Sequence, residues 1–294
     1  MQHLVDIDSF TTQDIEKIFI DAKSFKEKLP NKLLENRLLI TLFFEASTRT
    51  RSSFEVAAKR LGASVVHLDP AKSSTKKGET LSDTFANLCA MNPDGVIIRH
   101  SQNETAQILA DMNLTPVINA GTGNLAHPTQ ALLDLFTIKE YFNNDIQNKK
   151  IAIVGDIVNS RVANSNIKLL TSYGIDVTLV APKEFMPKTK LKNSDNLKDV
   201  IDSVDLIISL RAQLERHHKP IFEDYNEYAK HYCITYDLIK EREIAIMHPG
   251  PVMRNIDISD EVLASSKSLV LKQVENGVFI RMAVLKHILL DNEY

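Results

Sequence analysis

The sequence predicts an α/β protein with two domains, each a mostly parallel sheet flanked by helices. Three observations lead to this prediction. Short apolar runs alternate with amphipathic stretches, a polar connection follows at 143–150, and the alternation then restarts. The length of 294 residues also fits two domains of ordinary size. We therefore expect a first domain over 1–142 and a second over 143–276.

The first half opens with its clearest pair of elements. The continuous apolar run at 38–44 predicts a buried strand. The apolar spacing that follows predicts a helix at 50–61, which Gly62 can end. The same reasoning predicts further strands at 64–68, 95–98 and 116–119, and further helices at 12–29, 79–91, 104–112 and 128–142.

The second half repeats this alternation after the polar connection. A helix at 162–173 should end at Gly174, and the last amphipathic stretch, 277–290, is helical by its spacing. That stretch could dock on either domain. The predicted strands lie at 151–154, 177–180, 205–209 and 243–247. A cleft between two such domains, bordered by the carboxyl ends of strands, is the expected ligand site.

Composition narrows the class of protein. The apolar fraction of 44% and the charged fraction of 25% are those of a globular protein, and no apolar run is long enough for a membrane span. The first residues lack the basic and apolar regions of a signal peptide, so we expect a cytoplasmic protein. A net charge of −3 argues against nucleic-acid binding. Cys89 and Cys233 indicate neither a disulfide framework nor a cysteine zinc site.

The turn between the first predicted strand and its helix carries the most informative motif. It reads Ser47-Thr48-Arg49-Thr50-Arg51. At such a turn, free backbone N–H groups and the helix dipole favour an anion, and a guanidinium grips phosphate oxygens in a bidentate manner. Taken alone, the motif is better explained by an ordinary helix cap with solvated arginines.

Two further clusters follow strands in the first half. Arg99 stands at a strand end, where a solvated arginine is the simpler interpretation. His127 and Gln130 lie at the start of a helix, where capping alone could explain the histidine. Gly121-x-Gly123-x-x-Ala126 matches a dinucleotide fingerprint, but an acid at a strand end about twenty residues later is missing. A nicotinamide or flavin cofactor is therefore disfavoured.

Polar clusters also follow strands in the second half. Arg161 and Arg211 stand after two predicted strands, and two guanidinium groups suit the two carboxylates of a diacid. The turn at 248–251 brackets a glycine with prolines and can present backbone carbonyls. The basic stretch 69–78 lacks the spacing of a P-loop, and its composition alone favours a solvated loop.

The sequence gives little support for a metal site or for a covalent catalytic nucleophile. His217 and His218 are adjacent, so they point in different directions from a helix, and no third ligand stands at a usable spacing. We expect solvated or packing roles for them. The nucleophile motifs of hydrolases and thiol enzymes are missing from the sequence. We therefore expect neither a metal nor a cofactor.

Taken together, four segments carry a resemblance. Phe44-Glu45-Ala46-Ser47-Thr48-Arg49-Thr50-Arg51, Lys76-Lys77-Gly78-Glu79-Thr80, His127-Pro128-Thr129-Gln130 and His248-Pro249-Gly250-Pro251 resemble the transcarbamoylase family, most closely its aspartate branch. The resemblance implies one domain for carbamoyl phosphate and one for L-aspartate. It also implies that the C-terminal helix, about 277–294, returns to the first domain, and that three identical chains share active sites at their boundaries.

The resemblance implies a role for each matching residue. Ser47, Thr48, Arg49, Thr50 and Arg99 would hold the phosphate, His127 the carbonyl oxygen and Gln130 the carbamoyl amide. Ser73 and Lys77 would enter the neighbouring subunit's site, Ser73 toward carbamoyl phosphate and Lys77 toward aspartate. Arg161, Arg211 and Gln213 would bind the aspartate carboxylates, and the carbonyls of Pro249 and Gly250 would lie against carbamoyl phosphate near the attacking amine. The implied catalytic residues are Arg49, His127 and Lys77.

The implied reaction is direct transfer of a carbamoyl group to the aspartate amine, an early step of pyrimidine biosynthesis without a covalent intermediate or a metal. The leaving phosphate is one candidate acceptor of the amine proton, and the sequence does not identify the acceptor. Met253-Arg254-Asn255 departs from the Asn-Arg-Gly pattern common in bacterial relatives, so these residues receive no role. A regulatory chain cannot be predicted from this sequence.

Two alternatives remain. An ornithine transcarbamoylase would carry a His-Cys-Leu-Pro turn at 248–251, and its cationic substrate would be repelled by Arg161 and Arg211. A non-catalytic homologue that binds a phosphate ligand or a partner would require a degenerate site, whereas every cluster here is intact.

Overall fold

The computed structural model describes residues 1–68, 79–217 and 221–291. The chain divides into two units, one comprising Met1–Leu133 and Glu275–Tyr294 and the other Asp134–Val274. These bounds fall inside two helices, whereas the sequence predicted bounds at 142 and 276. Most of the C-terminal helix groups with unit 1, as the resemblance implied.

Unit 1 contains a parallel sheet with the strand order β2-β1-β3-β4. Its elements are α1 (Thr12–Glu27), β1 (Leu38–Phe43), α2 (Thr48–Arg60), β2 (Ser64–Leu68), α3 (Leu81–Cys89), β3 (Gly95–His100), α4 (Thr105–Asp111), β4 (Val117–Thr122), the first part of α5 (Pro128–Tyr141) and most of α10 (Val270–Leu289).

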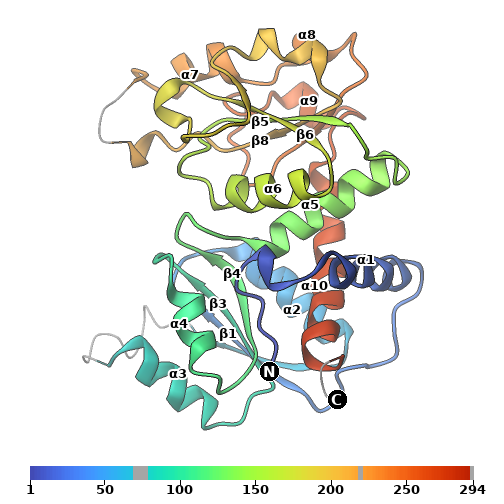
Figure 1. Ribbon diagram of the computed structural model, residues 1–294, viewed down its shortest axis with the longest axis vertical. Coiled ribbons are helices and arrows are strands. Elements are labelled where there is room, and N and C mark those ends of the chain that lie inside the picture. Colours follow the sequence, from blue (N-terminus) through green and yellow to red (C-terminus); the bar gives the residue numbers. More distant parts are fainter. Residues whose placement is uncertain (69–78, 218–220, 292–294) are drawn as a thin grey trace. The chain divides into compact units, whose positions relative to one another are not determined.

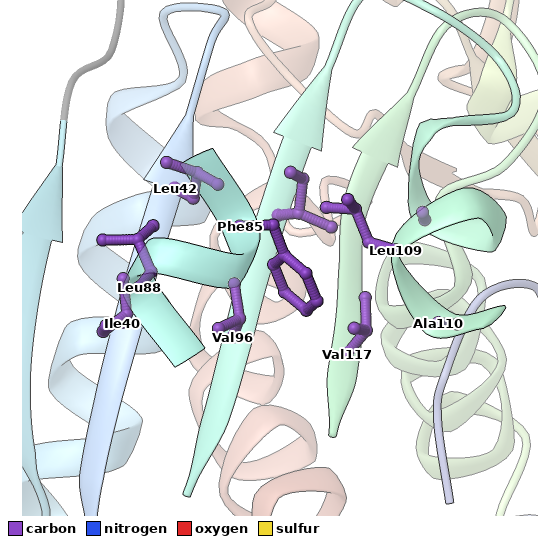
Figure 2. Packing of buried hydrophobic residues seen from close by; sticks show 10 residues of the cluster. Ile40, Leu42, Phe85, Leu88, Val96, Leu109, Ala110 and Val117 are labelled. Atoms are coloured by element: carbon purple, nitrogen blue, oxygen red, sulfur yellow. The ribbon is translucent and has the colours of Figure 1, made fainter. Parts of the chain in front are cut away.

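Helices cover both faces of the unit 1 sheet. Figure 1 shows α3 and α4 on one side of the strands and α2 and α10 on the other. On the first side, Phe85 of α3 and Leu109 of α4 pack against alternate residues of β1, β3 and β4, which Figure 2 shows around Val96. Phe85, Leu109 and Val96 are all fully buried. Because successive strand residues face opposite sides, near-continuous apolar strands give the sheet two buried faces.

Unit 2 contains a second parallel sheet, with the strand order β7-β6-β5-β8-β9. Figure 1 shows α6 on one side of this sheet and α7 and α8 on the other. The elements are β5 (Lys150–Val154), α6 (Arg161–Ser172), β6 (Asp176–Val180), β7 (Lys192–Ser194), β8 (Leu206–Ser209), α7 (Tyr225–Tyr232), α8 (Tyr236–Ile239), β9 (Ala245–Met247) and α9 (Asp260–Ala264). The predicted fold class, two parallel sheets flanked by helices, is therefore confirmed.

Both cysteines are free thiols. Burial raises the pKa of Cys89 and of Cys233 to about 11, so each is a neutral side chain at physiological pH. Within the described ranges, no helix has the length and apolar character needed to cross a bilayer.

Candidate functional site

In unit 1, the predicted phosphate-binding residues lie after three neighbouring strands. Ser47 follows β1, Arg99 lies near the end of β3, and His127 follows β4. In the sheet β3 pairs with both β1 and β4. Because the strands are parallel, these residues gather at the carboxyl edge of one sheet, the usual place for ligands in α/β proteins.

The start of α2 is open toward solvent and any ligand. Ser47 is its N-cap, yet among the described residues its hydroxyl makes no capping hydrogen bond. By contrast, Thr80 and Ser160 cap α3 and α6 by accepting from a first-turn N–H. The first turn of α2 also contains no acidic residue. The N–H groups of Thr48 and its neighbours can therefore bind an anion.

Cationic groups accompany this helix start. Arg49 lies in the first turn of α2 and is solvent-accessible, and partial desolvation by neighbouring atoms lowers its pKa. An arginine so perturbed still carries its charge at neutral pH. Arg99 is more enclosed. Its Nη1 donates to the Ala120 carbonyl at 3.1 Å, and its Nε lies 3.4 Å from a Glu45 carboxylate oxygen. These contacts hold its guanidinium between the segment that follows β1 and strand β4 itself.

The segment after β4 positions two buried side chains. His127 and Gln130 are 5% and 7% exposed, and the His127 carbonyl accepts from the Gln130 N–H as α5 begins. Gly123 in this segment has φ +47°, and a Cβ there would lie 1.7 Å from Asn103 Oδ1. Gly123 of the apparent dinucleotide fingerprint is therefore explained by its positive φ and by the close approach of the Asn103 side chain within this fold.

In unit 2, three loops follow the neighbouring strands β5, β8 and β9. Arg161 is the first residue of α6, whose N-cap Ser160 accepts from the Ala163 N–H. Gly155 directly follows β5 with φ +125°, and a Cβ there would lie 2.7 Å from the Leu210 carbonyl oxygen. Only glycine permits this approach, so the loops after β5 and β8 meet backbone to backbone.

The loop after β8 holds Arg211 in an extended network. Arg211 Nη2 donates to Glu215 Oε1 at 2.9 Å, and the Tyr225 hydroxyl donates to Glu215 Oε2 at 2.6 Å. Although desolvation opposes ionisation, the Tyr225 hydrogen bond and the charge of Arg211 lower the pKa of Glu215. Gln213 Nε2 donates to the Asn159 carbonyl at 3.4 Å, which connects this loop to the loop that carries Arg161.

A buried carboxylate also joins these two loops. His217 Nε2 lies 2.9 Å from Asp156 Oδ2, and the His217 ring stacks on Phe185 with centroids 4.0 Å apart. Asn159 Nδ2 donates to both oxygens of Asp156. Burial raises the pKa of Asp156, and the hydrogen bonds from His217 and Asn159 oppose that rise. His217 thus has a packing role, as predicted, whereas His218 lies outside the described residues.

The third loop contains the predicted proline-glycine turn. Pro249 is half-buried, Gly250 has φ +73°, and the Gly250–Pro251 peptide is cis. The Gly250 N–H donates to His248 Nδ1 at 2.8 Å. Arg254 pairs with Asp260, a contact between exposed side chains.

The structure therefore places the predicted residues in two groups. Unit 1 carries Ser47, Thr48, Arg49, Thr50, Arg99, His127 and Gln130, and unit 2 carries Arg161, Arg211, Gln213, Pro249 and Gly250. Ser73 and Lys77 lie outside the described residues. Sequence reasoning missed Glu215, the partner of Arg211, and the buried Asp257. Glu215 could have been found from the sequence, because it stands four residues after Arg211, a spacing typical of ion pairs.

No group of three or more histidine, cysteine, aspartate or glutamate side chains in the described ranges could hold a metal ion. Both units instead offer cationic side chains and N–H donors, which suit anionic ligands. Chemically, unit 1 can bind a phosphoryl group and unit 2 a carboxylate-bearing molecule.

Known proteins resemble the chain along nearly its whole length. Residues 2–140 match the carbamoyl-P binding domain of the aspartate/ornithine carbamoyltransferase family, and residues 147–288 match the Asp/Orn binding domain of that family. The aspartate carbamoyltransferase catalytic subunit of Sulfurovum sp. is 66% identical over 292 residues, which cover 99% of both chains.

Solved structures agree. The catalytic subunit of M. jannaschii aspartate transcarbamoylase superposes with a TM-score of 0.90 at 34% identity, covering 100% of this chain and 99% of that one. Aspartate transcarbamoylase from Trypanosoma cruzi, in complex with carbamoyl phosphate and aspartate, superposes with a TM-score of 0.89 at 30% identity, covering 98% and 97%. The chain belongs to the aspartate/ornithine carbamoyltransferase family.

Proposed function

We propose that this chain transfers the carbamoyl group of carbamoyl phosphate to the amine of L-aspartate. The products are N-carbamoyl-L-aspartate, an early intermediate of pyrimidine biosynthesis, and phosphate. The observation that carries the choice of aspartate is the pair of arginines that follow β5 and β8 in unit 2, one at the start of α6 and one in the loop after β8. Arg161 and Arg211 match the two carboxylates of a diacid and would repel the cationic side chain of ornithine.

Unit 1 binds carbamoyl phosphate in this proposal. The open start of α2 and Arg49 hold the phosphate, together with Arg99. His127 donates to the carbonyl oxygen, and Gln130 binds the carbamoyl amide. These assignments are supported by the motif resemblance and by the gathering of the three strand ends.

Unit 2 binds aspartate. Arg161, Arg211 and Gln213 hold its carboxylates, and the carbonyls of Pro249 and Gly250 lie against carbamoyl phosphate near the attacking amine. The amine nitrogen forms a bond to the carbamoyl carbon, and the bond from that carbon to the phosphate oxygen breaks. The amine loses one proton, whose acceptor is not assigned. The cations offset the repulsion of two anionic substrates, and the developing oxyanion gains about 3 kcal/mol for each well-aimed donor.

Product analysis tests the substrate directly. The protein is mixed with carbamoyl phosphate and either aspartate or ornithine, and the carbamoylated product is identified by mass spectrometry. We expect carbamoyl aspartate. Faster carbamoylation of ornithine contradicts the assignment of unit 2, and binding of carbamoyl phosphate in calorimetry without any turnover supports a non-catalytic homologue.

We also propose a cytoplasmic homotrimer in which Ser73 and Lys77 serve the site of a neighbouring chain. The support is the match of the segment 76–80 to the family motif. Mixing an inactive Arg49→Ala chain with an inactive Lys77→Ala chain should restore part of the activity, because some sites then receive both native residues. Verified mixed trimers without any rescue contradict shared sites.

A further inference from the structure

Asp257 is a buried carboxylate that connects two loops of unit 2. Its side chain is 0% exposed. Oδ1 accepts from the Ala212 N–H at 3.1 Å, and Oδ2 accepts from the Met253 N–H at 2.8 Å. Ala212 stands directly between Arg211 and Gln213. One side chain therefore fixes the backbone of the loop after β8 and that of the loop after β9.

His248 extends this connection into the proline-glycine turn. Its Nδ1 accepts from the Gly250 N–H at 2.8 Å, so the proton of the neutral ring is on Nε2. His248 Nε2 then donates to Asp257 Oδ2 at 3.2 Å. The His248 N–H donates to Gln273 Oε1 at 2.8 Å, which anchors the turn from its other side. The position of Gly250 thus depends on Asp257 through the His248 ring.

Burying a carboxylate is costly unless hydrogen-bond donors surround it. The three donors to Asp257 come from Ala212, Met253 and His248, and each lies in or beside a segment to which the proposed function assigns substrate contacts. A neighbouring acid, Asp260, is by contrast exposed and pairs with Arg254 at the surface. The buried Asp257 carboxylate therefore holds together two segments that are proposed to contact substrates, Arg211–Gln213 and Pro249–Gly250.

We propose that Asp257 is a positioning residue of the acceptor site, which sets the Arg211–Gln213 backbone against the turn at Pro249–Gly250 without touching the substrate itself. This inference rests on the proposed function. A merely structural role would lower stability or weaken the binding of aspartate and of inorganic phosphate alike. A positioning role raises the KM for aspartate and leaves the binding of inorganic phosphate, whose proposed donors all lie in unit 1, nearly unchanged.

The test variant is Asp257→Asn, which keeps the shape of the side chain. Either orientation of the amide sets its NH₂ group against at least one N–H donor, from Ala212 or from Met253 and His248. Losing a hydrogen bond to a charged group in this way should raise the KM for aspartate about tenfold. The dissociation constant of inorganic phosphate, whose proposed donors all lie in unit 1, should change less than about twofold.

Asp260→Asn is the matched control and should leave both values unchanged. His248→Asn is the second variant, because its Oδ1 can still accept from the Gly250 N–H while the bond to Asp257 is lost. It should raise the KM for aspartate less than Asp257→Asn does, and it serves as the test should Asp257→Asn not fold.

An aspartate KM close to that of the wild type in a folded Asp257→Asn protein overturns the inference, and so does an equal loss of phosphate affinity. The wild-type protein is assayed first with aspartate and ornithine. If the wild-type protein does not carbamoylate aspartate, both the proposed function and the inference are wrong. If the wild type is active and the Asp257→Asn variant has the same KM for aspartate, only the inference is wrong.

Discussion

The two units hold their charged groups by different means. In unit 1 all the candidate phosphate donors except Arg99 are consecutive residues at the start of α2, where helix geometry itself supplies free N–H groups. In unit 2 the segment that carries Arg211 depends on a distant residue, because its Ala212 N–H donates to Asp257, 45 positions along the chain. An anion site of the first kind is local in sequence, whereas a site of the second kind depends on tertiary contacts.

The largest effect should come from unit 1. Arg49→Ala removes a cation from the first turn of α2, where the phosphate is proposed to bind, and should lower kcat by about 10²- to 10³-fold, as for the loss of one oxyanion donor. The fold should survive, because Arg49 is exposed. Steady-state assays and circular dichroism check this.

Lys59→Ala is the matched control for Arg49, since it removes a cation from the last turn of the same helix. It should retain wild-type rates. A wild-type rate in Arg49→Ala itself contradicts the phosphate assignment.

The next effect sharpens the assignment of unit 2. Arg211→Ala removes a charged donor to a carboxylate, so the KM for aspartate should rise roughly 10- to 100-fold. The phosphate affinity should stay near that of the wild type. Titrations of both ligands measure this selectivity.

Arg254→Ala is the control for Arg211, because Arg254 is an exposed arginine of the same unit that pairs with Asp260. Kinetics unchanged by Arg254→Ala agree with its lack of an assigned role. Equal weakening of phosphate and aspartate binding by Arg211→Ala argues against separate binding surfaces.

The smallest effect concerns stability and pH. Burial raises the pKa of Asp156 above its ordinary value of 3.8, so the folded protein binds this proton more tightly than the unfolded chain does. Its contribution to the free energy of unfolding therefore falls as the pH rises from about 3.8 through the raised pKa. The stability difference, wild type minus Asp156→Asn, should decrease over that range in urea unfolding.

For Asp260→Asn we expect the opposite pH dependence of the stability difference between wild type and variant. Its hydrogen bonds from Arg254 and Asn255 lower the pKa of Asp260, so its contribution is present above 3.8 and is lost as the pH falls through the lowered pKa. A wild-type minus Asp156→Asn difference that rises with pH contradicts the account of Asp156.

Most of the fold could be predicted because apolar strands and amphipathic helices alternate. The exceptions have physical causes. The edge strand β7 (Lys192–Ser194) is short and mostly exposed, so it carries no apolar signal. The last helix begins at Val270 rather than at the predicted Gly277. Gly277 lies inside the helix, where a Cβ would come within 3.1 Å of Leu133. Close packing, not a helix boundary, explains this glycine.

The site divides in the same way. The motif at 47–51 could be proposed from the sequence, together with the other family motifs, because its candidate donors are adjacent residues. Asp257 could not, because its partner Ala212 lies 45 positions away and only the folded sheet brings the two together. Asp156 was visible at a strand end, but its burial and its contact with His217 depend on the loop after β8.

The approach of Gly155 to Leu210 has a practical consequence for protein engineering. The distance between the segments after β5 and β8 is set by direct contact of their main chains at Gly155 and Leu210. A substitution at Gly155 cannot create room for a longer diacid, because glycine has no side chain to shorten. Enlarging the acceptor repertoire requires redesigned loop lengths, and a library of point substitutions at position 155 would yield damaged proteins instead.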